Sequence, residues 1–153
     1  MSTAQDFFDI GDKTALICDD SANLDRLKTT IEELGYKTHS AETSERAIER
    51  MKYTAYDLIT VTETLAGSNL ETNGVLRYLG PLPMAQRRNS FILLVGESFR
   101  TLDAMQAYTQ SVHLVVNPSD LINLGPVLKK GLTEFAAFYR VYNEVLSASG
   151  EGG

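Results

Sequence analysis

The sequence has little of what marks secreted, membrane-spanning or nucleic-acid-binding proteins. Its one cysteine, Cys18, excludes an internal disulfide framework and suits a reducing compartment. Because Cys18 lies in an apolar run, we interpret it as a buried structural thiol. No stretch approaches the ~20 apolar residues that a membrane helix needs, and the N-terminus lacks the apolar core of a signal peptide. We therefore expect a cytoplasmic protein that has no membrane partner.

Positive charge is also scarce. The formal net charge is −6 and the isoelectric point is about 4.9, which works against the dense basic face that nucleic acids require. The two basic doublets, at 87–88 and 129–130, are isolated, and we interpret them as solvated positions. His39 and His113 stand alone without metal-ligand spacing, and residues 67–69 form a turn without a phosphate-loop pattern. We expect neither a nucleic-acid partner nor a cofactor.

What the sequence does contain is a regular alternation of short apolar runs and amphipathic segments. Its 153 residues, 43% of them hydrophobic, are enough for one core and too few for two full-sized domains. Apolar runs predict strands over 14–18, 36–40, 56–62, 91–95 and 112–116. Helical spacing predicts helices at about 24–34, 47–51, 75–79, 101–109 and 120–146. In the fourth helix we expect Leu102, Met105 and Tyr108 to face the core.

This alternation predicts an α/β fold of three layers, in which a doubly wound, parallel five-stranded sheet carries helices on both faces in (βα)5 order. We expect an N-terminal extension over 1–12, a domain with an extended last helix over 13–146, and a flexible Ser/Gly-rich tail over 147–153. In such sheets ligands bind beyond the carboxyl ends of the strands. The residues to examine are therefore those that follow the strands: Asp19-Asp20, Thr62-Glu63, Val95-Gly96 and Asn117-Pro118.

Several of these residues form a recognisable set of motifs. The acidic pair Asp19-Asp20 follows the first strand, and Tyr56-Asp57-Leu58-Ile59 opens the third. Gly74 precedes the third helix, and Asn117-Pro118 follows the fifth strand. With these motifs in register, the chain over about 13–131 resembles the receiver domain of bacterial two-component response regulators. The resemblance implies a flavodoxin-like fold and a non-enzymatic signalling module that binds a protein partner in a bacterial regulatory pathway.

The resemblance also implies a role for each strand end. In receiver domains an aspartate after the third strand accepts a phosphoryl group, the acidic pair helps it hold Mg²⁺, and a Thr or Ser and a Lys contact the phosphoryl oxygens. Counting from Asp57 places Thr62 at the acceptor position, and Val95 and Asn117 fall at the hydroxyl and Lys positions. A threonine hydroxyl needs a base that a carboxylate does not need. We therefore expect a pseudo-receiver with a degenerate pocket that consists of Asp19, Asp20, Thr62, Val95 and Asn117.

Alternatives remain at this pocket. Asp19 and Asp20 either retain weak Mg²⁺ affinity or, with Ser21, cap the first helix. Glu63 is the nearest other carboxylate and would make the chain an atypical phosphorylatable receiver, although a shift of one residue turns a strand side chain to the other face. A small α/β nucleotide-binding protein or enzyme would share only the layout. The loop before Gly74 is longer than receivers usually have, and is either a surface insertion or a partner contact.

The last predicted helix is also longer than in receiver domains, which usually end it near Leu132. Its apolar residues continue at spacings of three and four on one broad helical face. They are Phe135, Phe138, Tyr139, Tyr142, Val145 and Leu146. Exposed aromatic side chains need a cover, and three covers fit: a second copy of the chain, a separate protein, or the N-terminal Phe7-Phe8 segment. We expect this face to be a partner or dimer surface.

Overall fold

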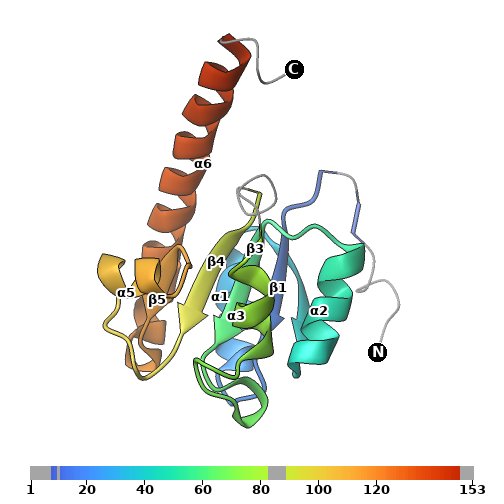
Figure 1. The fold of residues 1–153 in the computed structure, drawn as a ribbon, viewed down its shortest axis with the longest axis vertical. Coiled ribbons are helices and arrows are strands. Elements are labelled where there is room, and N and C mark those ends of the chain that lie inside the picture. Colours follow the sequence, from blue (N-terminus) through green and yellow to red (C-terminus); the bar gives the residue numbers. More distant parts are fainter. Residues whose placement is uncertain (1–7, 10, 83–88, 149–153) are drawn as a thin grey trace.

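The computed structural model describes residues 8–9, 11–82 and 89–148, with the backbone alone for 143 and 146–148. Its centre is one parallel sheet with the strand order β2-β1-β3-β4-β5 (Figure 1). The strands are β1 (Thr14–Cys18), β2 (Lys37–Ala41), β3 (Leu58–Thr62), β4 (Phe91–Val95) and β5 (Leu114–Val116). The helices are α1 (Leu24–Glu33), α2 (Ser44–Tyr53), α3 (Gly74–Leu79), α5 (Ala104–Thr109) and α6 (Leu124–Ala148), with 3₁₀ turns η2 (Leu65–Gly67) and η3 (Pro118–Asn123). The predicted α/β architecture is confirmed.

Helices cover both faces of the sheet. As a result β1, β3, β4 and β5 are buried along their whole length, which explains their continuous apolar sequences. The edge strand β2 instead mixes exposed and buried residues. On one face, Leu27 of α1 and Leu128 of α6 share an apolar cluster with Ile17. On the other face, Ala47 of α2 and Val75 of α3 belong to a second cluster, so the molecule has three layers.

Three strands differ slightly from the predicted limits. β2 starts one residue later than the apolar pattern predicts, at Lys37. β3 begins after Tyr56, whose hydroxyl lies 2.6 Å from Nδ1 of His39. β5 begins after His113, whose Nδ1 accepts a hydrogen bond from the Ile92 N–H at 2.9 Å. The side chains before β3 and β5 thus form contacts of their own, and the regular strands begin beyond them.

α5 is shorter than predicted and turns a different face to the core. It begins after Asp103, which is its N-cap, and Leu102 precedes it in a left-handed conformation with φ of 69°. The prediction that Leu102, Met105 and Tyr108 are buried is wrong, because these side chains are 61%, 71% and 80% exposed. The buried residue of α5 is Ala107. The helix therefore presents large apolar side chains to solvent.

α6 confirms the prediction of an extended last helix, and its end at Ala148 lies two residues beyond the expected limit. Leu124 and Leu128 in its first turns are fully buried. Its second half projects beyond the amino edge of the sheet, where the parallel strands begin (Figure 1). Among the helices that the structure describes, none combines the length and the apolar character needed to cross a membrane.

Phe8 shows where the described part of the N-terminal extension lies. Its ring stacks on the ring of His39 with centroids 4.2 Å apart and meets Tyr56 edge-on. Tyr56 belongs to the apolar cluster under α2 and α3, on the face of the sheet opposite α6, and Phe8 packs against that cluster. Phe7 lies outside the described residues. Phe8 therefore does not cover the aromatic end of α6, and for this residue the prediction of an intramolecular cover is wrong.

Candidate functional site

Parallel pairing brings the predicted pocket residues to one edge of the sheet. Thr62 ends β3 opposite Val95, and Val95 ends β4 opposite Val116. Asp19 and Asn117 follow β1 and β5 directly. The sequence therefore placed these residues at the correct ends of their strands.

The two carboxylates of the acidic pair accept hydrogen bonds from different parts of the chain. Asp19 is fully buried, and its Oδ1 accepts the Ser21 N–H at 2.7 Å, while its Oδ2 has no hydrogen-bond partner among the described residues. Asp20 is exposed, and its Oδ2 accepts the Ala66 N–H in the loop after β3 at 3.1 Å. The capping prediction is wrong for both, and for Ser21, because a turn separates them from α1, whose N-cap is Asn23.

Asp19 and Asp20 are not joined by a third metal-ligating side chain among the described residues. Mg²⁺ requires near-octahedral oxygen ligands, and carboxylates usually provide its protein ligands. Within the described parts of the chain, no three His, Cys, Asp or Glu side chains are close enough to hold a metal ion. Asp19 Oδ2 is the buried carboxylate oxygen that remains without a partner there. Weak residual Mg²⁺ binding by Asp19 and Asp20 stays a prediction.

Three pocket positions differ from the receiver pattern, and their side chains are either buried or hydrogen-bonded to other residues of the chain. Thr62 is 9% exposed, and its hydroxyl has no hydrogen-bond partner in the described part of the structure. Val95 is 1% exposed and belongs to the apolar cluster under α1 and α6. The Asn117 amide donates to the Phe99 carbonyl at 2.9 Å, and its Oδ1 accepts the Ser119 N–H at 3.0 Å. Asn117 therefore caps η3 and fastens the loop that follows β4.

Glu63 directs its carboxylate toward the end of β4. It is 8% exposed, its Oε1 accepts the Ser98 N–H at 3.2 Å, and its Oε2 accepts the Ser98 hydroxyl at 2.5 Å. Gly96 leaves the space for it, since a Cβ at that position would overlap with Glu63 Oε1. Sequence reasoning found the carboxylate and missed Ser98, because this loop residue has no periodic relation to β3.

The loop between β3 and α3 is fastened to the same edge by Asn73. This side chain is fully buried, and its amide donates to the backbone carbonyls of Thr62 at 2.9 Å and Glu63 at 3.2 Å. Its Oδ1 accepts the N–H groups of Val75 and Leu76. Asn73 therefore caps α3 and fixes the end of β3. Both interpretations of the longer loop, as an insertion or as a partner contact, stay predictions.

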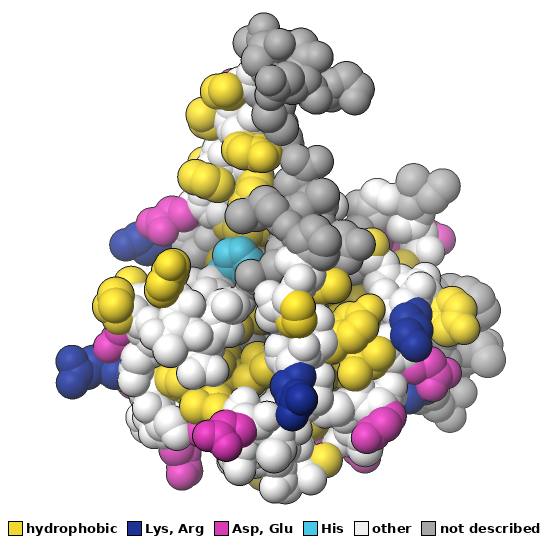
Figure 2. All heavy atoms as spheres, viewed as in Figure 1, with side chains coloured by type: hydrophobic (Ala, Val, Ile, Leu, Met, Phe, Trp, Pro, Cys, Tyr) yellow, Lys and Arg dark blue, Asp and Glu magenta, His cyan; other side chains and the backbone are white. Residues whose placement is uncertain are grey.

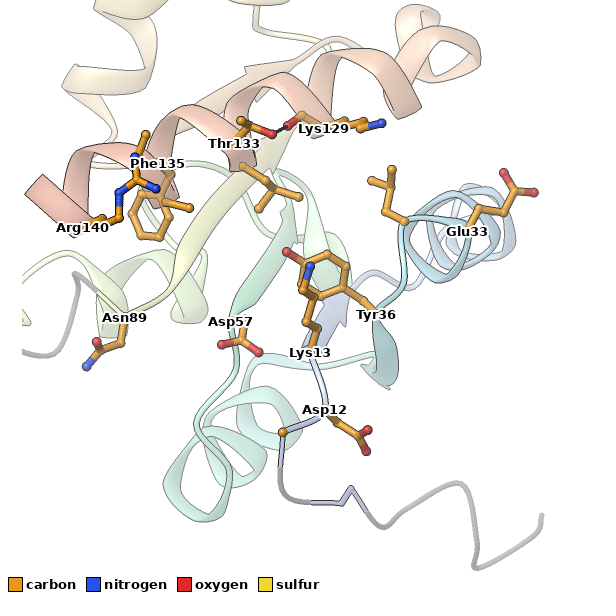
Figure 3. A pocket seen from close by; sticks show the side chains of 15 residues that line it. Asp12, Lys13, Glu33, Tyr36, Asp57, Asn89, Lys129, Thr133, Phe135 and Arg140 are labelled. Atoms are coloured by element: carbon orange, nitrogen blue, oxygen red, sulfur yellow. Dashed lines mark hydrogen bonds between the residues drawn. The ribbon is translucent and has the colours of Figure 1, made fainter.

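A cavity of about 920 Å³ lies at the opposite, amino edge of the sheet (Figure 3). Its lining includes Lys13, Tyr36, Asp57, Lys129 and Arg140, and the Lys13 ammonium lies 5.9 Å from the centre of the Tyr36 ring. Burial raises the pKa of Tyr36, and the nearby charge of Asp57 adds to the shift. The lining comes from the segment before β1, the segment after α1, the start of β3 and α6, so no sequence spacing could have revealed it.

The outer half of α6 carries the predicted apolar face into solvent. Phe138, Val141, Tyr142 and Val145 are 62%, 54%, 37% and 61% exposed. Hydrophobic side chains run along this projecting part of the molecule (Figure 2). Phe135 is partly buried and contacts Tyr139, with ring centroids 4.7 Å apart. The side chain of Leu146 lies outside the described residues, and sequence reasoning missed Val141.

Comparison with solved structures identifies the fold. NtrX from Brucella abortus, in a complex with ADP, is 17% identical with a TM-score of 0.66, and the match covers 86% of this chain and 30% of NtrX. The signal receiver domain of a histidine kinase from Syntrophus aciditrophicus is 21% identical with a TM-score of 0.62, covering 80% of this chain and 91% of that domain. A response regulator receiver domain protein from Methanospirillum hungatei is 18% identical with a TM-score of 0.60, and the match covers 82% of this chain and 97% of that protein.

The comparisons therefore support the receiver fold and nothing finer. No protein-family model and no curated protein sequence matches the chain. The chain spans less than a third of the length of NtrX but nearly the whole of the two isolated receiver domains. The flavodoxin-like, receiver-like fold agrees with the predicted one.

Proposed function

We propose that this chain is a pseudo-receiver: a signalling module of a bacterial regulatory pathway that acts by binding proteins and is not switched by phosphorylation of its own pocket. The observation that carries the proposal is the chemistry of the carboxyl edge. Thr62, Val95 and Asn117 occupy the ends of β3, β4 and β5, where a receiver needs a carboxylate, a hydroxyl and an ammonium group.

The contacts at this edge support the proposal. A hydroxyl such as that of Thr62 becomes a nucleophile when a base takes its proton. Asp19 and Glu63, the buried carboxylates here, each accept hydrogen bonds from the protein. The Asn117 amide is neutral and holds the loop after β4. At the position of the receiver lysine, an incoming phosphoryl group would therefore meet a neutral amide that is already bonded to the Phe99 carbonyl.

The strongest rival is an atypical receiver that is phosphorylated on Glu63. The observation in its favour is a buried carboxylate one residue beyond the expected acceptor. Against it, both carboxylate oxygens of Glu63 accept hydrogen bonds from Ser98, and phosphorylation would remove at least one of these bonds. The N–H or the hydroxyl of Ser98 would then need a new acceptor.

Intact-mass measurement separates the two. The chain is incubated with Mg²⁺ and a small phosphodonor, beside a functional receiver domain that serves as the positive control. The proposal predicts an unchanged mass for this chain and a phosphoryl adduct on the control. A labile adduct on this chain would overturn the proposal, and loss of that adduct in Glu63→Gln would assign it to the rival site.

We further propose that the binding surface is the outer half of α6, and that its partner is a second copy of this chain. Four large apolar side chains of this half are more than a third exposed, and contiguous exposed apolar surface is typical of protein interaction sites. A solvent-exposed helix of this kind gains stability mainly when its apolar face is covered by another surface.

A further inference from the structure

An apolar groove of about 660 Å³ lies between α5 and α6. Its α5 side includes Leu102, Ala104 and Ala107. Its α6 side includes Val127, Lys130, Gly131, Glu134 and Phe138. Met105 and Tyr108 on α5 are also exposed. Apolar side chains of both α5 and α6 therefore line the groove.

The groove and the exposed half of α6 lie on one line. Val127, Gly131, Glu134 and Phe138 follow each other at spacings of four, three and four, which keeps them on one side of the helix. The same spacing continues from Phe138 to Tyr142 and Val145, which belong to the exposed half. The inner half of this helical side is thus a groove wall, and the outer half is an apolar ridge.

The outer ridge of one α6 can pack into the inner groove of a second copy. If two α6 helices pack antiparallel with the two-fold axis near Ala137, each outer ridge lies along the inner groove of the other copy. Lys130 and Glu144 lie two helical turns before and after Ala137, so each Lys130 comes beside the partner's Glu144. Lys130 is 78% exposed and lies 4.0 Å from Glu134 in its own helix, so it is free to reorient.

A parallel pair fits less well. In register, it would place the two Lys130 side chains on opposite edges of the seam, and likewise the two Glu144 side chains, so no Lys130–Glu144 pair would form across the helices. It would also leave both grooves uncovered, since each exposed ridge would meet the other ridge. A two-stranded parallel coiled coil further favours charged residues beside its seam. With Phe138, Tyr142 and Val145 on the seam, Tyr139 and Val141 would occupy those flanking positions.

We infer that a second copy of this chain is the occupant of the groove: the two α6 helices pack antiparallel, and the outer half of each lies between α5 and α6 of the other. This inference rests on the dimerisation proposed above and adds its geometry and its recognition chemistry. Phe138, Tyr142 and Val145 provide the buried apolar contact. Lys130 and Glu144 set the direction of the helices.

Charge reversal tests the direction. Lys130→Glu and Glu144→Lys should each raise the dimer dissociation constant about 5- to 20-fold, because each removes two symmetric ion pairs and adds repulsion. The double variant should return to within about threefold of the wild type, since it recreates both pairs in reverse. Lys129→Glu is the matched control, because Lys129 lines the cavity on the other side of α6. Sedimentation equilibrium measures the wild type and these four variants.

Cross-linking gives a second, independent test. Chains with Lys130→Cys are mixed with chains with Glu144→Cys and treated with a short thiol cross-linker. The native Cys18 is fully buried, and burial raises the pKa of its thiol, so it does not compete. The antiparallel dimer predicts mixed 130–144 products. It also predicts no 144–144 product, because these positions are about 21 Å apart along the helices.

The outcomes separate the inference from the proposed function. A dimer that gives 144–144 products, or that the double charge reversal does not restore, overturns the antiparallel geometry while dimerisation stands. A wild type that stays monomeric at high concentration overturns both the inference and the dimer surface, and α6 is then left for a different protein. Neither result touches the pseudo-receiver proposal, which the intact-mass measurement decides.

Discussion

Glu63, Gly96 and Ser98 form a small unit at the carboxyl edge in which each residue depends on the others. The carboxylate accepts two hydrogen bonds from Ser98, and the missing side chain of Gly96 provides the space. The Asn117 amide similarly donates to the Phe99 carbonyl in the loop after β4, and its Oδ1 accepts the Ser119 N–H in η3. At the scale of single residues, the side chains of Glu63 and Asn117 therefore stabilise loops, whereas Asp19 Oδ2 and the Thr62 hydroxyl have no hydrogen-bond partner among the described residues. A phosphoryl group on Glu63 would require its carboxylate to give up a contact with Ser98.

Gly96→Ala should destabilise the fold by about 2–3 kcal/mol. Its Cβ would overlap the Glu63 carboxylate, which is itself buried and would have to move and give up its part-buried hydrogen bonds with Ser98. Urea denaturation measures the change. The control is Gly125→Ala, where the nearest atom to the new Cβ, from Thr30, is 3.9 Å away. Equal stability of the two variants would show that the Glu63 contact contributes little.

Cys18 should make the protein less stable at alkaline pH. Burial raises the pKa of this thiol from its ordinary value of 9.0, so above pH 9 the unfolded chain releases a proton that the folded chain keeps. Its contribution to stability is complete below that pH and falls by up to about 1.4 kcal/mol per pH unit above it. Denaturation of wild type and Cys18→Ala across this range checks the prediction. Parallel pH profiles for the two proteins would contradict it.

The pocket positions could be predicted from sequence because they are tied to strand ends. Thr62 and Val95 end apolar runs whose limits are clear, and Asn117 stands beside a proline that stops the next one. The contacts of these residues could not be predicted. Asp20 bonds to Ala66 across the sheet edge, which no local pattern encodes. The assignment of Asp20 as a helix cap failed for that reason.

Asn73 shows how one side chain can determine the junction between two elements. It bonds to the end of β3 and to the start of α3 at the same time. Asn73→Ala should therefore lower the free energy of unfolding by about 2–4 kcal/mol, because it leaves buried backbone groups without partners.

The control for this prediction is Asn69→Ala in the same loop. Asn69 also accepts two backbone hydrogen bonds, from Glu71 and Thr72, but these are exposed to solvent that can replace them. We expect a loss of about 1 kcal/mol or less there. If the two variants lose the same stability in chemical denaturation, Asn73 is not the structural link described here.

The elements themselves were predictable where the sequence pattern is continuous. β4 consists of five successive apolar residues that are buried on both faces, and its predicted limits, Phe91 and Val95, are those observed. α5 was not predictable to the same degree. Its cap at Asp103 and the left-handed Leu102 shift its start, which exposes Met105 and Tyr108. Apolar spacing alone cannot distinguish a face that packs on the core from one that awaits a partner.

At the scale of the whole molecule, two regions lie at opposite edges of the sheet. The altered pocket lies where the strands end, and the projecting half of α6 lies beyond the edge where they begin (Figure 1). Because α6 starts beside β5 and runs back along the sheet, it spans the distance between them. In our account the first region has become structural, and the second carries the interaction.

The central claim is that the chain associates through α6 independently of phosphorylation chemistry. Sedimentation equilibrium of the full chain, with and without Mg²⁺ and a small phosphodonor, tests it most directly. The account predicts a dimer with the same dissociation constant in both conditions, and a shift toward monomer in Phe138→Asp. A dissociation constant that changes when the phosphodonor is added, or a wild type that does not self-associate, would contradict it.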